Sequence, residues 1–173
     1  MNIKIPQSIF EALDKNIHNR IDFDCGVQVL NDFLKNKASK EMKQKINTTY
    51  VLTTDQENTL KPIIGYYTLS TSSLVLSAVP PHLSKHVPPN YQLPTVRIGR
   101  LARDENYPGT GSLLLKDALL RIINASNSIG IYGVEVDAKD NIAKLFYEKF
   151  GFISLIDDKY SLFLPLKTIL TSL

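Results

Sequence analysis

The sequence has no tryptophan, a single cysteine, Cys25, and only three histidines among its 173 residues. One cysteine cannot form an intramolecular disulfide, and it cannot supply a zinc cluster of several thiolates. His18 is far from His82 and His86 in the sequence, and all three histidines fall in expected turns or loops. We therefore predict surface histidines and no metal site.

The chain also lacks a long apolar run. Two of the longest, Leu74–Leu76 and Leu162–Leu166, are far shorter than the roughly 20 residues of a membrane-spanning helix. The first residues, Met1–Pro6, do not contain the apolar segment of a signal peptide, so we expect a cytoplasmic protein without a membrane contact. A length of 173 residues with 43% hydrophobic residues suits one domain, which we predict to span residues 1–173.

The segment from 138 to 152 carries the clearest local pattern. Asp140 or Asn141 suits the N-cap of a helix, and Gly151 suits its C-terminal end. Apolar residues recur between these ends at helical spacing: Ile142, Leu145, Phe146 and Phe150. The pattern predicts a helix of about ten residues that carries Tyr147 and follows a strand over 132–137.

A second pattern lies between residues 98 and 123. It predicts a strand over 98–104, a short loop with Gly109 and Gly111, and a helix over 113–123. Glycines let a backbone approach a diphosphate closely, and the free N–H groups at a helix start point toward the anion. By itself, a Gly-x-Gly pattern is equally typical of an ordinary strand-to-helix turn.

The chain has a glycine loop before one helix and then, after a strand, the segment Asn141-x-Ala143-x-x-Phe146-Tyr147. This order of motifs resembles the GNAT superfamily of N-acetyltransferases. The resemblance implies an α/β protein with the GNAT acyl-CoA N-acyltransferase fold, in which helices flank a mixed central sheet. It implies acetyl-CoA as the co-substrate and no metal.

The resemblance also implies how acetyl-CoA is held. Backbone groups of the strand would pair with the pantetheine arm as an additional strand would, the glycine loop would bind the diphosphate, and Asn141 would hydrogen-bond the arm. Asn106 stands where the family has glutamine or arginine, and Pro108 removes one N–H donor from the loop. The implied cofactor-binding residues are Leu101, Ala102, Arg103, Asn106, Gly109, Thr110, Gly111, Ser112, Asn141 and Tyr147.

The N-terminal part narrows the resemblance. Segments 22–26, 30–34, 65–70 and 99–102 are similar to the GNAT toxins of bacterial toxin–antitoxin systems, and the similarity extends from about residue 20 to residue 166. It implies transfer of acetyl to the free amine of aminoacyl-tRNA, which blocks translation. It further implies a ribbon-helix-helix antitoxin as a partner and a homodimer.

Basic residues gather in two zones although the net charge is only +3. Five lysines lie between residues 35 and 45, in a helix that we predict over 27–45, and three arginines lie on the strand over 98–104 and just before it. Lysines on a helix more often form a solvated face than a nucleic-acid surface. The candidate tRNA contacts are Arg97, Arg100, Lys35 and Lys40.

Acetyl transfer from a thioester to an amine needs a neutral amine and a proton for the departing thiolate. An α-amine, with a pKa of about 8, is partly neutral at pH 7. Tyr147, with an ordinary phenol pKa of about 10, can donate to a thiolate whose thiol has a pKa near 8.5, and the family assigns this acid role to the matching tyrosine. A core aromatic is the alternative interpretation of Tyr147. No residue stands out as a dedicated general base, and we name none.

Two other functions stay open. One is an N-acetyltransferase of a small amine or a protein N-terminus, which needs the same cofactor site. The other is a non-catalytic, partner-binding GNAT fold that no longer binds CoA. The remaining predicted elements are strands over 48–53, 63–69 and 160–165, and a proline-rich loop over 80–94.

Overall fold

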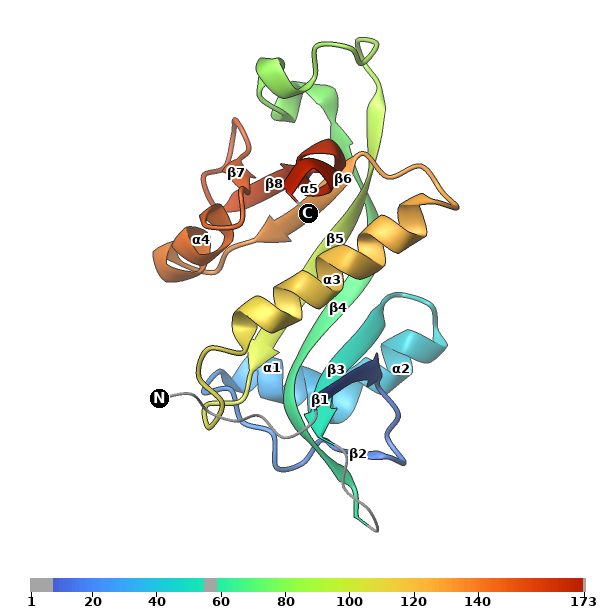
Figure 1. The fold of residues 1–173 in the computed structure, drawn as a ribbon, viewed down its shortest axis with the longest axis vertical. Coiled ribbons are helices and arrows are strands. Elements are labelled where there is room, and N and C mark those ends of the chain that lie inside the picture. Colours follow the sequence, from blue (N-terminus) through green and yellow to red (C-terminus); the bar gives the residue numbers. More distant parts are fainter. Residues whose placement is uncertain (1–7, 55–58, 173) are drawn as a thin grey trace. The chain divides into compact units, whose positions relative to one another are not determined.

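The computed structural model of the chain describes residues 8–54 and 59–172. The chain forms two compact units (Figure 1): unit 1 comprises Met1–Ser70 and Arg100–Ala118, and unit 2 comprises Thr71–Gly99 and Leu119–Leu173. The unit boundaries fall inside three continuous elements. These are β4 (Lys61–Val75), β5 (Gln92–Arg103) and α3 (Gly111–Ser126).

Unit 1 is built on antiparallel strands. β1 (Ser8–Ala12) pairs with β3 (Thr48–Thr54), and β3 pairs with β4. The short β2 (His18–Asn19) runs parallel to β4. β3 is rich in β-branched residues, which suit a pleated surface, and most of its residues are buried.

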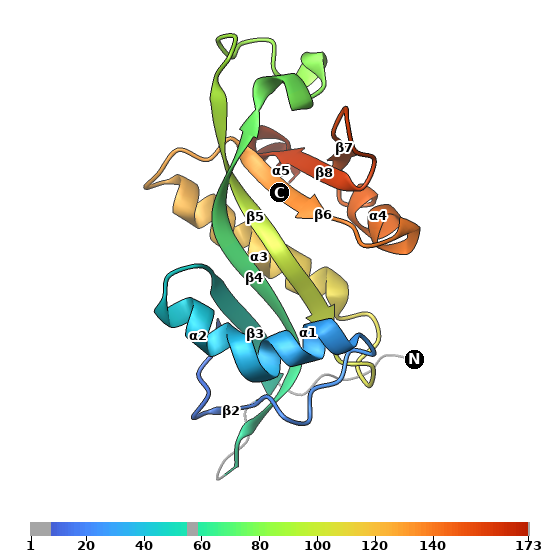
Figure 2. The same cartoon turned by 180° about the vertical axis from the view of Figure 1, so that it is seen from behind.

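The predicted helix over 27–45 forms, but it is not a regular α-helix. It consists of α1 (Gln28–Asp32), a π-helical turn, η1 (Phe33–Lys37), and α2 (Ala38–Lys43). Figure 2 shows this helical segment in front of the unit 1 strands, and α2 contacts β3. Its apolar side chains enter the core of unit 1, where the Phe33 and Tyr66 rings stack with centroids 6.0 Å apart.

Unit 2 is also built around a sheet. β5 pairs in parallel with β6 (Gly133–Asp137), and β8 (Ser161–Pro165) pairs antiparallel with both β6 and β7 (Ile153–Ser154). α5 (Leu166–Ser172) contacts β8 and β6. α4 (Asn141–Glu148) lies between β6 and β7 in the chain. Parallel and antiparallel pairs together confirm the predicted mixed sheet.

The proline-rich segment differs from the prediction at its C-terminal end. It contains the 3₁₀ turn η3 (Pro81–Leu83) and is preceded by a second, η2 (Leu76–Ala78), but residues from Gln92 onward already belong to β5. Pro94 therefore lies within a strand rather than in the loop. It cannot donate a hydrogen bond, but its carbonyl accepts one from the Tyr132 N–H at 2.7 Å.

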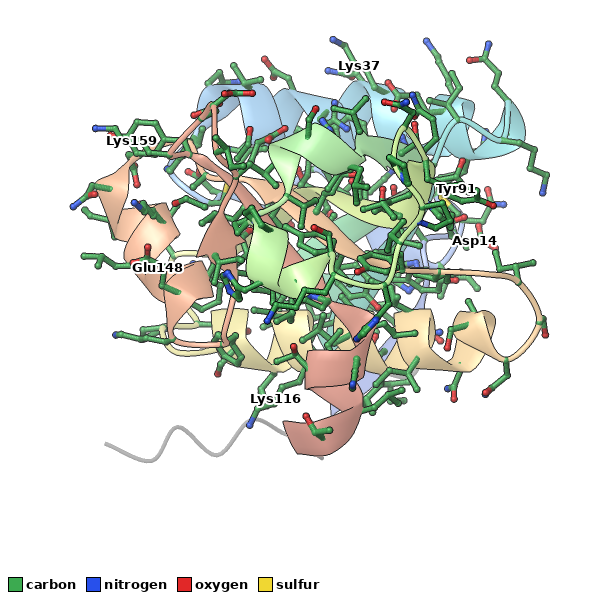
Figure 3. The ribbon with its side chains drawn as sticks, turned by 90° about the horizontal axis from the view of Figure 1, so that it is seen from above. Asp14, Lys37, Tyr91, Lys116, Glu148 and Lys159 are labelled. Atoms are coloured by element: carbon green, nitrogen blue, oxygen red, sulfur yellow. The ribbon has the colours of Figure 1, made fainter. Side chains whose placement is uncertain are left out.

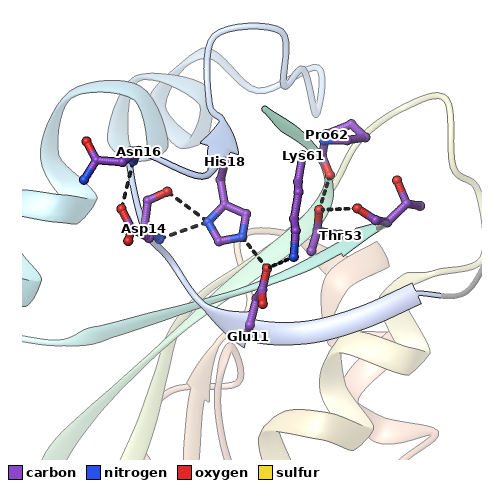
Figure 4. Close-up of polar contacts among 8 residues, drawn as sticks. Glu11, Asp14, Asn16, His18, Thr53, Lys61 and Pro62 are labelled. Carbon is purple, nitrogen blue, oxygen red and sulfur yellow. Dashed lines mark hydrogen bonds and ion pairs between the residues drawn. The ribbon is translucent and has the colours of Figure 1, made fainter. Parts of the chain in front are cut away.

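His18 is not a surface residue, so that prediction was wrong. Its side chain is only 1% exposed, and its Nε2 donates to Glu11 Oε1 at 2.8 Å (Figure 4). Lys61 Nζ lies 3.0 Å from the same oxygen. Partial burial would raise the pKa of Glu11, but the hydrogen bonds from His18 and Lys61 outweigh it, and the pKa is lowered.

Candidate functional site

The glycine loop in unit 1 has the geometry of an anion site. Gly109 has a φ of +85°, which favours glycine, and a Cβ at this position would meet no atom within 4 Å. Thr110 precedes α3, and its carbonyl accepts the N–H groups of Leu113 and Leu114, both at 3.1 Å. The four successive N–H groups of Gly109–Ser112 have no partner among the described residues. They form a row of donors at the positive end of α3, which suits a diphosphate.

Asn106 does not contribute its side chain to this row. Its Nδ2 and its backbone N–H both donate to Asp104 Oδ1, each at 2.9 Å. The other carboxylate oxygen of Asp104 accepts the Asp24 N–H at 3.0 Å. Asn106 therefore stabilises the loop through hydrogen bonds inside it. At this position of the family pattern, the residue has a structural role.

The segment over 22–26 supports the same loop, which the sequence alone did not indicate. The Asp24 carbonyl accepts the Glu105 N–H at 2.9 Å. Asp24 Oδ1 accepts both the Gly26 N–H at 2.9 Å and Asn31 Nδ2 at 2.7 Å. The start of α1 is thus bonded to the strand-to-loop junction. The only signal in the sequence was the pair of acidic residues that flank Phe23, Asp22 and Asp24. The partner of Asp24 is Asp104, which lies 80 residues later, so no local pattern reveals it.

One backbone edge of β5 is open where Leu101, Ala102 and Arg103 lie. β5 lies between β4 and β6 in the strand order, but its ladder with β6 ends at the pair Ile98–Val136. Among the described residues, the last part of β5 thus pairs with no strand on that side. Such an edge suits an extended ligand that adds to a sheet.

Tyr147 lies on α4 in unit 2 and packs among aromatic rings. Its ring centroid is 5.2 Å from that of Phe146 and 5.5 Å from that of Phe152. The residue is 8% exposed, so the ring is part of the packed interior. Helical spacing alone did not show how exposed the rest of this face is: Ile142 is 81% exposed and Leu145 is 51% exposed.

The hydroxyl of Tyr147 makes no hydrogen bond to any residue that the structure describes. Among the described residues, Ser39 Oγ is the only fully buried side-chain oxygen or nitrogen that lacks a hydrogen-bond partner. The unpartnered hydroxyl of Tyr147 is therefore not fully buried, and a ligand can reach it. Burial raises the pKa of Tyr147 to about 12. The phenol is therefore fully protonated at neutral pH, and its hydrogen is available to a ligand.

Asn141 is also available, because it is not the helix cap. Asp140 takes that role, and its Oδ1 accepts the Ala143 N–H at 2.8 Å. Asn141 is exposed at the first position of α4, and its side chain has no partner among the described residues. An amide in this position can both donate and accept hydrogen bonds.

Two of the predicted tRNA contacts are engaged within the protein. Arg97, in unit 2, donates to Glu135 Oε2 at 2.9 Å and to Asp137 Oδ2 at 3.0 Å. Arg100, in unit 1, lies over the Phe33 ring, with its guanidinium carbon 3.7 Å from the ring centroid. The charge of Arg97 is thus neutralised locally, whereas that of Arg100 is held against the core by a cation–π contact.

The lysines of the helical segment lie differently. Lys40 is exposed, Lys35 is half-buried, and neither forms an ion pair with a described carboxylate. Figure 3 shows the side chain of Lys37, from the same segment, pointing away from the ribbon. These charges are available to an anionic partner.

No group of three or more histidine, cysteine, aspartate or glutamate side chains in the described ranges is arranged to hold a metal ion. Nor does any helix within 8–54 or 59–172 have the length and apolar character to cross a membrane.

Three features of this chain are those of an N-acetyltransferase with the GNAT fold. They are a mixed sheet with helices on it, a row of free N–H donors after a glycine, and a protonated tyrosine without a partner among the described residues. No family model matches the chain. A probable toxin TacT of Sinorhizobium fredii is 32% identical over 177 residues, which cover 97% of this chain and 96% of that protein. A tRNA-acetylating toxin of Mycobacterium tuberculosis is 30% identical over 147 residues, which cover 84% of each chain.

Solved structures agree with these relatives. A tyrosine-to-phenylalanine mutant of KacT has a TM-score of 0.89 and 32% identity, covering 96% of this chain and 99% of its own. AtaT complexed with acetyl-methionyl-tRNAfMet has a TM-score of 0.87 and 32% identity, covering 95% and 98%. AtaTR bound with acetyl-CoA has a TM-score of 0.82 and 32% identity, covering 95% and 97%. The chain belongs to the GNAT toxins of toxin–antitoxin systems.

Proposed function

We propose that this chain transfers the acetyl group of acetyl-CoA to the free amine of an aminoacyl-tRNA and so blocks translation. The similarity to a tRNA-acetylating toxin, at 30% identity over 84% of both chains, carries this proposal. Charged tRNA is a cytoplasmic substrate, so we place the activity in the cytoplasm. We also propose that residues 1–173 act as a single GNAT domain.

Acetyl-CoA is bound, in this proposal, by backbone groups more than by side chains. The N–H groups of Gly109–Ser112 bind the diphosphate, and the open edge at Leu101–Arg103 pairs with the pantetheine arm. The free side-chain amide of Asn141 hydrogen-bonds the same arm. The departure at Asn106 does not weaken this assignment, because the donor row is complete without its side chain.

In the reaction, the neutral amine attacks the thioester carbonyl carbon, a C–N bond forms, and the C–S bond breaks. The nitrogen loses a proton to water, and the sulfur leaves as a thiolate. An α-amine with a pKa of about 8 needs no strong base for this step. Tyr147 donates a hydrogen bond to the departing sulfur, and the thiolate then takes a proton from solvent.

Tyr147 acts chiefly as a hydrogen-bond donor. Its pKa of about 12 exceeds that of a thiol, about 8.5, by about 3.5, so complete transfer of its proton is unfavourable by about 5 kcal/mol. A charge-assisted hydrogen bond to the developing thiolate stabilises the transition state without requiring a tyrosinate.

For tRNA, Lys35 and Lys40 are the better of the proposed contacts, because they have no carboxylate partner among the described residues. Arg97 and Arg100 remain candidates, but each would first have to leave a contact within the protein. Lysine contacts to phosphates give binding that is independent of sequence and weakens with salt.

We further propose that a small antitoxin of the ribbon-helix-helix class binds this chain and inhibits it, and that the chain forms a homodimer. Among the solved relatives, AtaT is bound to the C-terminus of the antitoxin AtaR, and KacTA is bound to DNA.

The test is transfer of labelled acetyl from acetyl-CoA to bulk charged tRNA, with tRNA stripped of its amino acids as the control. We expect label on charged tRNA alone. Label on neither tRNA, while acetyl-CoA still binds, would refute the tRNA assignment and direct the search to small amines and protein N-termini.

A further inference from the structure

A pocket of about 380 Å³ lies in unit 1, beside the helical segment. Five of its lining residues are cations, and no acidic residue lines it. The cations are Lys15, Arg20, Lys35, Lys40 and Lys43. The other two lining residues are the neutral Asn36 and Ser39, and together these seven residues define what we call the basic pocket.

The π-helical turn η1 shapes this pocket. In an α-helix, the carbonyl of Lys35 would accept the N–H of the residue four positions later. Here the Ala38 N–H bonds instead to the Phe33 carbonyl, five positions earlier, and the Lys35 carbonyl accepts Arg20 Nη1 at 2.6 Å. Single π turns inside helices are frequent at functional sites. The turn thus holds a guanidinium from a distant part of the chain against the lysine helix.

Arg20 uses one of its five N–H donors in this contact, so it keeps a planar set of donors that matches the oxygens of a phosphate. The Ser39 Oγ is buried and is therefore not one of the groups that a ligand in the pocket would contact.

None of the five cations forms an ion pair with a carboxylate that the structure describes. Lys35 interacts electrostatically with Asp24, which does not line the pocket. The pKa of Asp24 is lowered mainly by hydrogen bonds from the Gly26 N–H and the Asn31 amide, and only to a lesser extent by the charge of Lys35. Five like charges around one small volume repel one another, and an anion would remove that repulsion.

We propose that the basic pocket binds a phosphate group, with Arg20 as the residue that orients it and Lys35, Lys40 and Lys43 as its counter-charges. Guanidinium and ammonium groups without a competing carboxylate select phosphate chemistry. The phosphate comes either from a nucleic-acid backbone or from a free phosphate compound. The first source rests on the proposed function and adds Arg20 to the tRNA contacts.

Two measurements on the full chain test this. The first follows the thermal unfolding midpoint during titration with inorganic phosphate, with potassium chloride at equal ionic strength as the reference. The second measures the affinity for uncharged tRNA over a range of salt concentrations. Neither needs acetyl transfer, so a failed acetylation assay leaves both results standing, and a failed phosphate titration says nothing against acetylation.

The variants are Arg20→Gln, Arg20→Lys and the double variant Lys40→Gln with Lys43→Gln. Lys116→Gln is the matched control, because Lys116 is an exposed lysine of unit 1 that lies outside the basic pocket (Figure 3). If Arg20→Gln does not fold, the double variant decides, since both of its lysines are exposed.

We expect phosphate to raise the midpoint of the wild type and of Lys116→Gln by more than that of Arg20→Gln or of the double variant, whose remaining response comes from the donor row at Gly109–Ser112. Arg20→Lys should respond weakly, since it keeps the charge and loses the planar donors. For tRNA, Arg20→Gln should bind about tenfold more weakly, and the salt slope of log K should fall by about 0.7–0.9 per lost phosphate contact.

A weaker phosphate response together with weaker tRNA binding identifies the tRNA backbone as the source. A weaker phosphate response with unchanged tRNA binding identifies a free phosphate compound, and the pocket assignment still holds. The proposal is overturned if phosphate stabilises the wild type no more than chloride does, or if it stabilises all variants equally.

Discussion

Replacing Tyr147 with phenylalanine removes one oxygen and should slow the chemical step without disturbing the fold. The ring contacts with Phe146 and Phe152 do not involve the hydroxyl, and that hydroxyl has no hydrogen-bond partner among the described residues. The free energy of unfolding should therefore change by no more than about 0.5 kcal/mol.

The expected size of the kinetic effect follows from the pKa of Tyr147. Since burial raises this pKa to about 12, the phenol donates a hydrogen bond to the thiolate and does not give up its proton fully. A hydrogen bond to a charged group contributes about 1.5–3 kcal/mol, which corresponds to about a 10- to 150-fold lower kcat. Affinity for acetyl-CoA should change little.

The pH dependence gives a second check on the same residue. The donor role needs the neutral phenol of Tyr147. Because the pKa of this phenol is raised, it stays neutral to a higher pH than an ordinary tyrosine does. The wild type should thus show no loss of kcat from phenol ionisation between about pH 7 and pH 10. The assay is steady-state acetyl transfer to charged tRNA, with acetyl-CoA affinity measured separately by calorimetry.

Three results would contradict the proposed role or the raised pKa of Tyr147. An unchanged kcat in the phenylalanine variant would exclude the donor role. A loss of acetyl-CoA affinity as large as the loss of kcat would mean that the tyrosine acts in binding. An alkaline fall in the wild-type rate below pH 10 that is absent from the variant would contradict the raised pKa.

Other perturbations test the remaining parts of the site and the fold. Gly109→Ala must adopt a positive φ at a cost of about 1–2 kcal/mol and should weaken acetyl-CoA binding by calorimetry about 5- to 30-fold, whereas Gly130→Ala, which meets no atom and has no positive φ, should not. Arg97→Met leaves the buried carboxylate of Glu135 without its guanidinium and should lower the free energy of unfolding in urea by about 1–3 kcal/mol; an unchanged value would assign Arg97 to the substrate alone. The pKa of Glu11 is lowered in the folded state, so its contribution to stability is present above the ordinary pKa of 4.5 and is lost as the pH falls through the folded-state pKa. Thermal unfolding of Glu11→Gln should thus depend less on pH in the acid range, and an identical dependence would contradict the pairing.

The parts of the site that the sequence predicted are those in which neighbours along the chain determine the geometry. α4 follows from a cap, an apolar repeat and a terminal glycine within about ten residues. The donor row follows from Gly109 and the helix that begins two residues later. Both patterns are local, so a reading of the chain recovers them.

The parts that it missed depend on residues distant in the sequence. His18 is buried because Glu11 and Lys61 supply its surroundings, and no turn signal near His18 reveals them. Arg97 is paired with an aspartate 40 residues away, which only the parallel pairing of β5 and β6 brings beside it. The contact between Arg20 and the π turn is likewise not local, because Arg20 lies 15 residues before the carbonyl that it binds.

The most direct test of the central claim is the identity of the acetylated atom. Charged tRNA would be incubated with this protein and acetyl-CoA, its ester bond cleaved by mild alkali, and the released amino acids analysed by mass spectrometry. We expect N-acetyl amino acids, and none when the amine has been blocked beforehand. Unmodified amino acids, or acetyl found on the nucleotides instead, would contradict it.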